Sequence, residues 1–480
     1  MCECALHKAK ARRACVIGAG PNGLAAAIVL AQAGLQVDVY EAETQPGGGT
    51  RTMELTLPGF LHDFGSAVHP MAAGSPFFDS LPLADHGLQW IHGIAPLAHP
   101  LDDGSAVTLE HSLKDQETTL GEDGGAWREL MEPLAEHWLD FAVDAMGPVT
   151  RIPRRPFLMA RLGRLSAQPA TKLARRTFRG PRARALFAGL CAHSFLSLDE
   201  PLSPAVGIIL GAAAHVVGWP IPRGGAQAIA TALIAHFEQL GGEVHTRRRI
   251  ESLDELGEVD GPILCDLTPR QLLAIAGSRL QKTYSQAMQD FRYGPGAFKI
   301  DYALSSPIPW RARECNRSIT VHLGGTLEEI ARSEDAMRHG GTSERPFVLV
   351  VQPTLFDPTR APAGKHVAWV YCHVPNDSSV DMTGRIEDQL ERFAPGFRDC
   401  VLQRCVSTPA NLERMDANLI GGDVMGGEMS IRQFIFRPAL GTYYTGTPNL
   451  YLCSASTPPG GGVHGMCGYH AARMALRRLR

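Results

Sequence analysis

The feature that most constrains the fold is a glycine-rich turn between an apolar segment and an alanine-rich segment near the amino terminus. Residues 14–17 (ACVI) predict a short buried strand, the turn GAGPNG follows directly at 18–23, and the apolar residues after it predict a helix. Residues 36–40 (QVDVY) predict a second strand, which leads into Glu41. This acid stands at roughly the 20-residue spacing of a dinucleotide fingerprint, so the order of elements indicates a Rossmann-like unit.

Each residue of this unit has a physical reason to be there. Gly18 allows the tight turn, Gly20 lets the backbone approach a pyrophosphate, and Gly23 permits close packing of helix on strand. The helix N-terminus then faces the phosphates. Glu41 can accept hydrogen bonds from a ribose, whereas a 2′-phosphate there would meet like charge, so FAD or NAD is favoured over NADP. The predicted cofactor contacts are Gly18, Gly20, Pro21, Asn22, Gly23 and Glu41.

The residues that follow the acid narrow the choice of cofactor. They read PGGGTRT at 46–52 and LPGFLHDFGSAVHP at 57–70. At this point the sequence resembles the flavoproteins that include monoamine oxidases and phytoene desaturases, most closely the phytoene-desaturase-related branch. The resemblance implies FAD, with Gly47 and Gly48 under the flavin and Thr52 in the final hydroxyl position of the motif. Arg51 is a candidate for the charge on the pyrophosphate, because a glycine replaces the arginine commonest in amine oxidases.

Two later segments extend the resemblance. Apolar residues at helical spacing predict a helix over 226–240 and then a strand over 243–250, although an ordinary helix–strand unit has the same periodicity. In the resembling family the residue that matches Ile250 lies beside the adenine. The segment 450–472 predicts a strand, a glycine-rich turn and a helix, whose N-terminal amides suit the pyrimidine edge of a reduced flavin. The cofactor contacts implied here are Ile250, Ser454, Gly461, Gly462, Val463 and Gly465.

The 480 residues suffice for two large domains. No second complete strand–GxGxxG–helix unit is visible, so we expect no separate NAD domain. The expected fold class is α/β, a Rossmann-like FAD-binding domain of the glutathione-reductase and amine-oxidase type built from discontinuous segments, interleaved with an α+β substrate domain. The FAD-binding domain is expected over 1–75, 222–295 and 445–480, and the substrate domain over 76–221 and 296–444.

Three residues are candidates for catalysis. The segment 294–304 (GPGAFKIDYAL) resembles the amine-oxidase strand whose lysine holds a water near the flavin N5, and Lys299 occupies the matching place. A lysine in an apolar strand is costly to bury without partners, which itself indicates a site, unless its side chain reaches the surface. His69 and His464, like His470, flank glycine-rich cofactor segments and could transfer protons near neutral pH. The alternative for each is a histidine without a catalytic role.

Composition and missing motifs exclude several classes. Lys plus Arg number 46 and Asp plus Glu 49, a net charge of −3 that gives no overall case for a nucleic-acid partner. The 11 cysteines are scattered without a C-x-x-C pair, which favours reduced thiols in a cytoplasmic protein. The polar, basic start leaves no room for a secretory apolar region. No spacing matches a zinc site, a P-loop or a serine-hydrolase elbow, so no metal is predicted.

One segment is locally very basic. Residues 151–186 hold 11 Lys or Arg and no Asp or Glu, interleaved with large apolar residues. Such a composition fits a surface that meets anionic lipid headgroups, and phytoene desaturases are peripheral membrane enzymes with lipophilic substrates. The alternative is a solvated arginine face. The uncharged stretch 205–219 would line an apolar substrate tunnel or form a core helix.

The function implied by the resemblance is FAD-dependent dehydrogenation or isomerisation of an apolar substrate, a polyene or other isoprenoid among the candidates, by hydride transfer to the flavin. The expected electron acceptor is oxygen or a quinone. A flavin amine oxidase is the second reading, weakened because Met466 stands near one of the places where amine oxidases have an aromatic ring. A non-catalytic, flavin-binding partner protein is the third.

Overall fold

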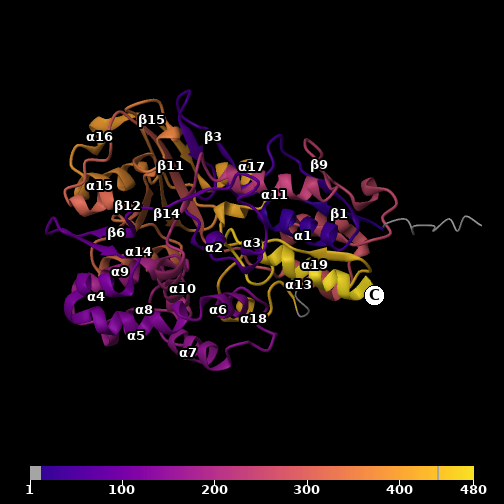
Figure 1. The fold of residues 1–480 in the computed structure, drawn as a ribbon, viewed down its shortest axis with the longest axis horizontal. Helices are drawn as coiled ribbons and strands as arrows, with labels where there is room; N and C mark the ends of the chain where they lie inside the picture. Colours follow the sequence, from indigo (N-terminus) through magenta and orange to yellow (C-terminus); the bar gives the residue numbers. More distant parts are fainter. Residues whose placement is uncertain (1–11, 440–442, 480) are drawn as a thin grey trace, which may run out of the picture.

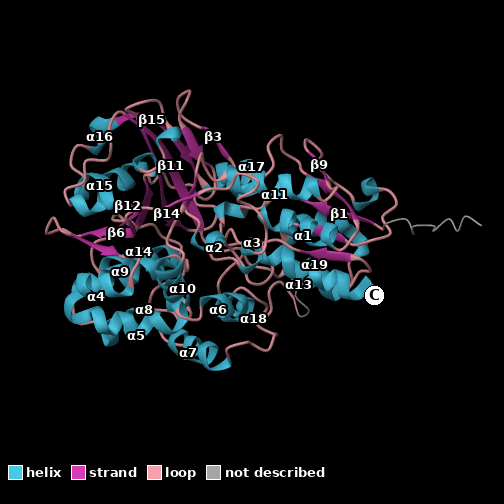
Figure 2. Ribbon diagram, in the orientation of Figure 1, coloured by secondary structure: helices cyan, strands magenta, loops and turns pink. Residues whose placement is uncertain are grey.

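The computed structural model describes residues 12–439 and 443–479. A parallel sheet with its helices lies at the right of Figure 1, a larger mixed sheet at the upper left, and a group of helices at the lower left. Figure 2 shows that helices dominate this lower group, whereas the mixed sheet carries most of the long strands.

The parallel sheet has the strand order β16-β10-β1-β2-β9. All its strand pairs are parallel, so their carboxyl ends share one edge, which is where open α/β sheets bind ligands. Three separate parts of the sequence supply the strands: β1 (Arg13–Ile17), β2 (Gln36–Tyr40), β9 (Glu243–His245), β10 (Ile263–Cys265) and β16 (Leu450–Leu452). The strand predicted over 243–250 ends at His245, because Arg247 takes a left-handed φ of 56°.

Helix α1 (Pro21–Gln32) is the central helix of this part. It packs against α11 (Gln227–Gln239) and α19 (Met466–Leu479). Small residues allow the close approach: a Cβ on Gly468 of α19 would lie 1.8 Å from the Asn22 carbonyl oxygen. Ala25, Ala26 and Ala27 of α1 are completely buried, which explains why this part of the helix is apolar on all sides.

The mixed sheet has the strand order β15-β11-β14-β13-β12-β6-β7, with all described pairs antiparallel except β12 with β6. Alternate residues of β11 face opposite sides, as in any strand. Phe298, Ile300 and Tyr302 pack into the core under the helices that follow. The elements of this part are β6 (Ala95–Pro100), β7 (Ala106–Leu109), β11 (Gly296–Leu304), β12 (Ser318–Leu323), α14 (Leu327–Arg338), β13 (Val348–Val351), β14 (His366–Val374), α15 (Thr383–Phe393), α16 (Phe397–Cys400) and β15 (Val401–Ser407).

The helical group contains the basic segment 151–186, whose residues form two helices and the start of a third. Its members are α4 (Leu113–Leu120), α5 (Gly124–Ala135), α6 (Trp138–Ala145), α7 (Pro156–Ser166), α8 (Ala170–Thr177), α9 (Pro181–Ala192) and α10 (Ser203–Val216). Helix α10 contacts α5, α7 and α9, so most of the uncharged stretch 205–219 is core helix. Among the described residues no helix is both long and apolar enough to cross a membrane.

Shorter elements connect these parts and line the site. They are β3 (Thr52–Glu54), β4 (Leu61–Asp63), α2 (Pro70–Ala73), α3 (Pro76–Asp79), β5 (Trp90–Ile91), β8 (Ile221–Pro222), α12 (Pro269–Ala276), α13 (Lys282–Gln289), α17 (Pro409–Met415) and α18 (Ile431–Ile435).

Candidate functional site

Three cavities adjoin one another from the edge of the parallel sheet to the mixed sheet. The first, of about 340 Å³, lies at the carboxyl ends of β1, β2 and β10. The second, of about 130 Å³, lies at the N-terminus of α1, and the third, of about 290 Å³, lies against β11 and β14. The first and second share Gly20, Gly48, Asp266, Asp416 and Asn418. The second and third share Gly49, Val424, Gly462 and Val463.

The amino-terminal glycines bring helix and strand together as a dinucleotide site requires. A Cβ on Gly23 would lie 2.0 Å from the Gly18 carbonyl oxygen, so only glycine lets α1 start this close to β1. Gly18 has a φ of 100°, which permits the turn. Gly20, the residue before the first turn of α1, lines the first two cavities and leaves backbone accessible there. Gly23 is therefore the glycine that lets the helix pack on the strand, and Gly20 is the glycine whose backbone faces the cavities.

The acid at the end of β2 is held in a fixed orientation. One carboxylate oxygen of Glu41 accepts a hydrogen bond from the Ala19 amide at 2.9 Å, and the other accepts from the Glu43 amide at 2.9 Å. Glu41 and Ile250 both line the first cavity, although Ile250 lies beyond β9. The arrangement suits a ribose and an adenine at this end of the groove.

An acid directly after the neighbouring strand β10 was not predicted from the sequence. Asp266 directly follows β10 and lines both the first and the second cavity. Its Oδ2 atom accepts a hydrogen bond from the Gly23 amide at 2.8 Å. The signal was a three-residue apolar segment followed by an acid, too short to identify as a strand. Asp416 and Asn418, after α17, were missed for a similar reason, since their position depends on the fold of the distant substrate segments.

Arg51 and Thr52 have partners within the chain. The Arg51 guanidinium lines the first cavity and donates to the carbonyl oxygens of Gly48, at 3.0 Å, and Met415, at 2.5 Å. Arg51 therefore connects the glycine-rich segment to the end of α17. The Thr52 hydroxyl donates to Asp63 at 2.7 Å and lies outside the three cavities. Of the two predicted cofactor contacts, Arg51 lies in the groove, whereas Thr52 lies outside it and hydrogen-bonds another residue of the chain.

The carboxyl-terminal turn enters the groove with some of its predicted residues. Ser454, Gly462 and Val463 line the second cavity together with Pro21 and Asn22. Gly461 and Gly465 instead allow close packing. A Cβ on Gly461 would lie 2.8 Å from the Met425 Cα atom, and one on Gly465 would lie 2.6 Å from the Phe78 ring. A Cβ on Gly47 would likewise lie 3.1 Å from the Ala230 Cβ atom of α11.

Lys299 is buried at the third cavity, not at the surface. It lies on β11 with 2% exposure and forms an ion pair with Asp301, two residues along the same face. Its Nζ atom also lies 5.8 Å from the centre of the Trp369 ring. Burial raises the pKa of Asp301 to about 6, although Lys299 acts in the opposite direction. A cation held in this way can bind a water or a substrate oxygen beside the cavity.

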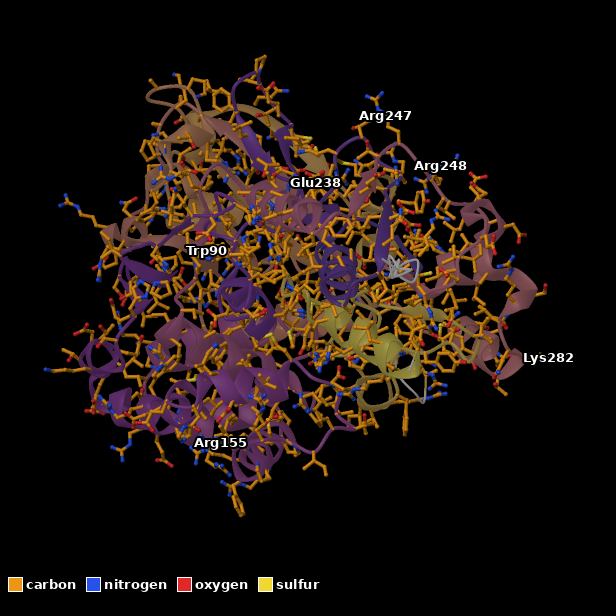
Figure 3. All side chains as sticks on the ribbon, turned by 45° about the vertical axis from the view of Figure 1, so that its right-hand side comes forward. Trp90, Arg155, Glu238, Arg247, Arg248 and Lys282 are labelled. Carbon is orange, nitrogen blue, oxygen red and sulfur yellow. The ribbon has the colours of Figure 1, made fainter. Side chains whose placement is uncertain are left out.

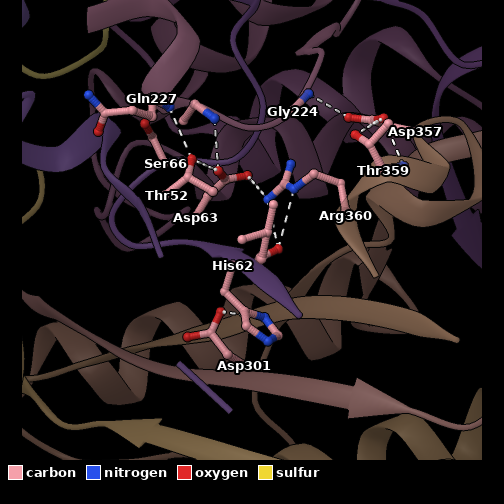
Figure 4. A network of polar contacts seen from close by, with 12 residues as sticks. Thr52, His62, Asp63, Ser66, Gly224, Gln227, Asp301, Asp357, Thr359 and Arg360 are labelled. Carbon is pink, nitrogen blue, oxygen red and sulfur yellow. Dashed lines mark hydrogen bonds and ion pairs between the residues drawn. The ribbon is translucent and has the colours of Figure 1, made fainter. Parts of the chain in front are cut away.

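A buried polar network supports this pair from the other side (Figure 4). His62 of β4 lies 3.6 Å from Asp301, measured from Nδ1 to Oδ1. Burial and the nearby Lys299 and Arg360 cations lower the pKa of His62 to about 3, so the ring is neutral at pH 7. The next residue, Asp63, forms a buried ion pair with Arg360 at 2.8 Å. Figure 4 also shows Asp357, which accepts from the Gly224 amide at 2.7 Å.

Of the histidine candidates, only some lie at the cavities. His69 lines the third cavity, its Nε2 atom lies 3.0 Å from the Ser66 hydroxyl, and burial lowers its pKa to about 4. His464 lines none of the three cavities, and its Nδ1 atom accepts from the Met466 amide at 3.1 Å. It therefore satisfies the first turn of α19. His470 hydrogen-bonds the Met146 carbonyl oxygen at 3.0 Å. His193, which the sequence analysis missed, does line the third cavity.

The walls of the third cavity are mostly apolar. Leu210 comes from α10, Phe195 and Trp219 from the segments that follow α9 and α10, and Trp369 and Tyr371 from β14. The last two rings lie 5.0 Å apart with their planes at 67°. Such a lining can exclude water from a C–H bond placed next to the glycines that the second and third cavities share.

The comparisons with known proteins agree with this geometry. Residues 16–99 match a family described as an NAD(P)-binding Rossmann-like domain. The mouse pyridine nucleotide-disulfide oxidoreductase domain-containing protein 2 is 28% identical, over 97% of this chain and 94% of that protein. A phytoene dehydrogenase of Streptomyces griseus is 24% identical over 93% of this chain and 91% of its own, and a lycopene-forming phytoene desaturase of Pseudescherichia vulneris is 25% identical over 97% and 99%.

Solved structures share the fold along the whole chain. An oxidoreductase from Methanosarcina mazei has a TM-score of 0.66 at 18% identity, covering 97% of this chain and 100% of its own. A putrescine oxidase triple mutant has a TM-score of 0.62 at 16% identity, covering 97% and 99%. Together with the full-length relatives, these matches show that the chain is similar over nearly its whole length to phytoene desaturases and shares the fold of the putrescine oxidase, with a Rossmann-like dinucleotide-binding unit.

Proposed function

We propose that the chain binds FAD and dehydrogenates or isomerises an apolar substrate. The observation that carries the proposal is the junction at Gly49, Gly462 and Val463, where the dinucleotide groove meets an apolar cavity. FAD bound along the groove would supply a hydride acceptor at this junction. The chain itself would orient the substrate, exclude water and hold a cation, Lys299, beside the reacting carbon.

We propose that the two predicted domains bind the cofactor and the substrate respectively. Residues 1–75, 222–295 and 445–480 would hold the cofactor, and 76–221 and 296–444 would hold the substrate. The proposed substrate is a lipophilic small molecule, with polyenes and other isoprenoids as the first candidates, and oxygen or a quinone would reoxidise the cofactor. No nucleic acid is part of the proposal.

The experiment that tests the proposal starts from the purified protein. Its absorbance spectrum should show a flavin, and heat should release FAD rather than FMN or NAD. Anaerobic mixing with a panel of lipophilic alkenes should then bleach the flavin, with a dehydrogenated or isomerised product found by mass spectrometry or NMR. Release of NAD, or of no nucleotide by a protein that also fails to bind added FAD, would contradict the proposal.

A flavin amine oxidase is the second candidate, favoured by the aromatic pair Trp369 and Tyr371 in the cavity wall. Release of hydrogen peroxide with amines, without turnover of alkenes, would establish it. A flavin-binding protein without turnover is the third. After photoreduction, a bound flavin that neither oxygen nor quinones reoxidise would favour that reading over both enzymes.

Replacing Lys299 with methionine should slow flavin reduction by the substrate about 100-fold, the lower end of what a positioned proton-transfer group contributes. The single change also leaves Asp301 buried without its cation, which costs stability. The double variant Lys299→Met/Asp301→Leu removes both charges and should recover the stability but not the rate. Stopped-flow absorbance and urea unfolding check the two effects, and Lys365→Met on the exposed surface is the control. A double variant with the wild-type rate would show that Lys299 is only structural.

We also propose that the surface formed by α6, the turn after it and the start of α7 contacts a membrane. Leu139 of α6, Ile152 of the turn and Phe157 of α7 are 70%, 88% and 91% exposed there, next to basic side chains. Figure 3 labels Arg155 at this surface, where it pairs with Asp140 at 2.9 Å. The protein should sediment with phosphatidylserine vesicles at low salt and be released by high salt. Ile152→Asp/Phe157→Asp should abolish this binding, whereas Leu402→Asp on β15 should not. Equal sedimentation of both variants would rule out this surface.

A further inference from the structure

The carboxyl group of Asp266 lies at the start of α1. Its Oδ2 atom accepts from the Gly23 amide at 2.8 Å, and a Cβ placed on Gly20 would lie 2.8 Å from the same oxygen. Asp266 is 5% exposed and faces the first and second cavities. The N-terminus of a helix that follows a glycine-rich turn is the usual place for a cofactor's phosphates. In this chain a carboxyl group is built into that place.

The surroundings of this carboxyl group disfavour a negative charge. Burial raises the pKa of Asp266 to about 7; the Gly23 amide acts against this shift, and the Asp416 and Glu41 carboxylates add to it. The thiols of Cys265, Cys453 and Cys467 also face it and carry no charge at neutral pH, since burial raises their pKa values.

The cations of the first cavity are engaged elsewhere. Arg51 donates to two carbonyl oxygens, Arg248 lies 3.8 Å from Glu255, and Arg249 lies 3.7 Å from Glu43. Figure 3 shows Arg248 at the outer surface of this region. None of these three forms an ion pair with Asp266 within the described part of the chain. A diphosphate at the helix would therefore add negative charge beside a carboxyl group that none of these three cations pairs with.

We infer that Asp266 is a cofactor-binding residue that acts in its neutral, protonated form, so that FAD binding takes up one proton from solvent. The inference rests on the proposed FAD site. The added proton removes the charge repulsion and gives the carboxyl group an O–H donor, which can bind a phosphate oxygen while the other oxygen keeps the Gly23 amide. No bond other than this O–H bond forms, and no electron is transferred.

The protein without cofactor should already show the same group. Asp266 holds its proton to a higher pH in the folded state than in the unfolded chain, where its ordinary value is 3.8. Its contribution to stability is therefore complete below about pH 4 and is lost as the pH rises toward about 7. Asp266→Asn should remove this part of the pH dependence of unfolding.

The deciding experiment is calorimetric titration of the cofactor-free protein with FAD at pH 8, in phosphate and in Tris, whose ionisation enthalpies differ. The wild type should take up close to one proton per FAD, and its affinity should fall about tenfold for each pH unit above 7. Asp266→Asn should bind FAD with no proton uptake and with an affinity independent of pH. Asp38→Asn, a carboxylate outside the groove that pairs with Arg13, should behave as the wild type.

Each outcome has a distinct meaning. FAD binding by the wild type without proton uptake overturns the inference and leaves the proposed function intact, and this measurement needs no variant to fold. Undiminished proton uptake by Asp266→Asn also overturns it, because another group then titrates. Failure of the wild type to bind FAD at any pH between 6 and 8 overturns the proposed function and the inference together.

Discussion

Replacing Gly23 with alanine is expected to abolish dinucleotide binding and to lower the free energy of unfolding by about 3 kcal/mol or more, at the upper end of overpacking costs. The new Cβ would lie 2.0 Å from the Gly18 carbonyl oxygen and 3.2 Å from the Asp266 Cβ atom. One contact is with backbone and the other with a side chain that hydrogen-bonds this same residue. Neither neighbour is the free end of a flexible side chain.

Helix α1 cannot relieve this contact by moving away. On its other side the Asn22 carbonyl oxygen already touches α19 at Gly468, where a Cβ would lie at 1.8 Å. The helix is held between two close backbone contacts, so the strain must distort the turn that approaches the phosphates. FAD fluorescence quenching and urea unfolding measure the two losses separately.

Gly163→Ala in α7 is the matched control for Gly23. A Cβ there meets nothing within 4 Å, so alanine should stabilise the helix by up to about 1 kcal/mol. Wild-type affinity for FAD in Gly23→Ala would contradict the role assigned to the turn.

The sequence predicted the amino-terminal unit well because its signals are local. The expected strand over 14–17 is β1, the strand over 36–40 is β2, and the turn between them lies where the fingerprint places it. Strand β10 was not predicted, since three apolar residues carry no periodicity. Its contact with the fingerprint joins Gly23 to Asp266, 243 positions apart, and no local pattern contains such a contact.

The candidate catalytic residues show the same limit. Lys299 and Asp301 stand two apart in a strand, so their pairing on one face follows from the alternation of side chains. His62 reaches them only because β4 packs on β14, next to β11 in the mixed sheet. His464 had the expected position in the sequence, but its Nδ1 atom accepts from an amide in the first turn of α19, and the residue lines none of the three cavities.

Replacing Arg360 with methionine is expected to destabilise the protein by about 3–5 kcal/mol at pH 7, the cost of leaving one partner of a buried ion pair. Arg360 and Asp63 are each about 1% exposed and lie 2.8 Å apart. The guanidinium also donates to the Leu61 carbonyl oxygen at 3.1 Å. Asp63 in turn accepts from the Ala226 amide at 2.8 Å, next to the start of α11. The pair thus joins β4 to the start of α11.

The pH dependence of this loss has a definite sign. In the wild type, burial alone would favour the neutral acid, but Arg360 and three hydrogen bonds lower the pKa of Asp63 below its ordinary 3.8. Its contribution is therefore present above about pH 4 and is lost as the pH falls further. Without Arg360, the buried carboxylate becomes easier to protonate. The difference between wild type and Arg360→Met should shrink as the pH is lowered from 7 toward 4.

Arg270→Met is the surface comparison, because its pair with Glu413 is half exposed. That change should cost no more than about 1 kcal/mol, the range of exposed ion pairs. Urea unfolding at pH 7, 5.5 and 4.5 measures both variants. Equal losses for the two arginines, or a loss for Arg360→Met that does not change with pH, would mean that the stability of this region does not depend on the Asp63 charge. A large, pH-dependent loss would mean instead that this buried pair holds β4, and His62 with it, beside Lys299.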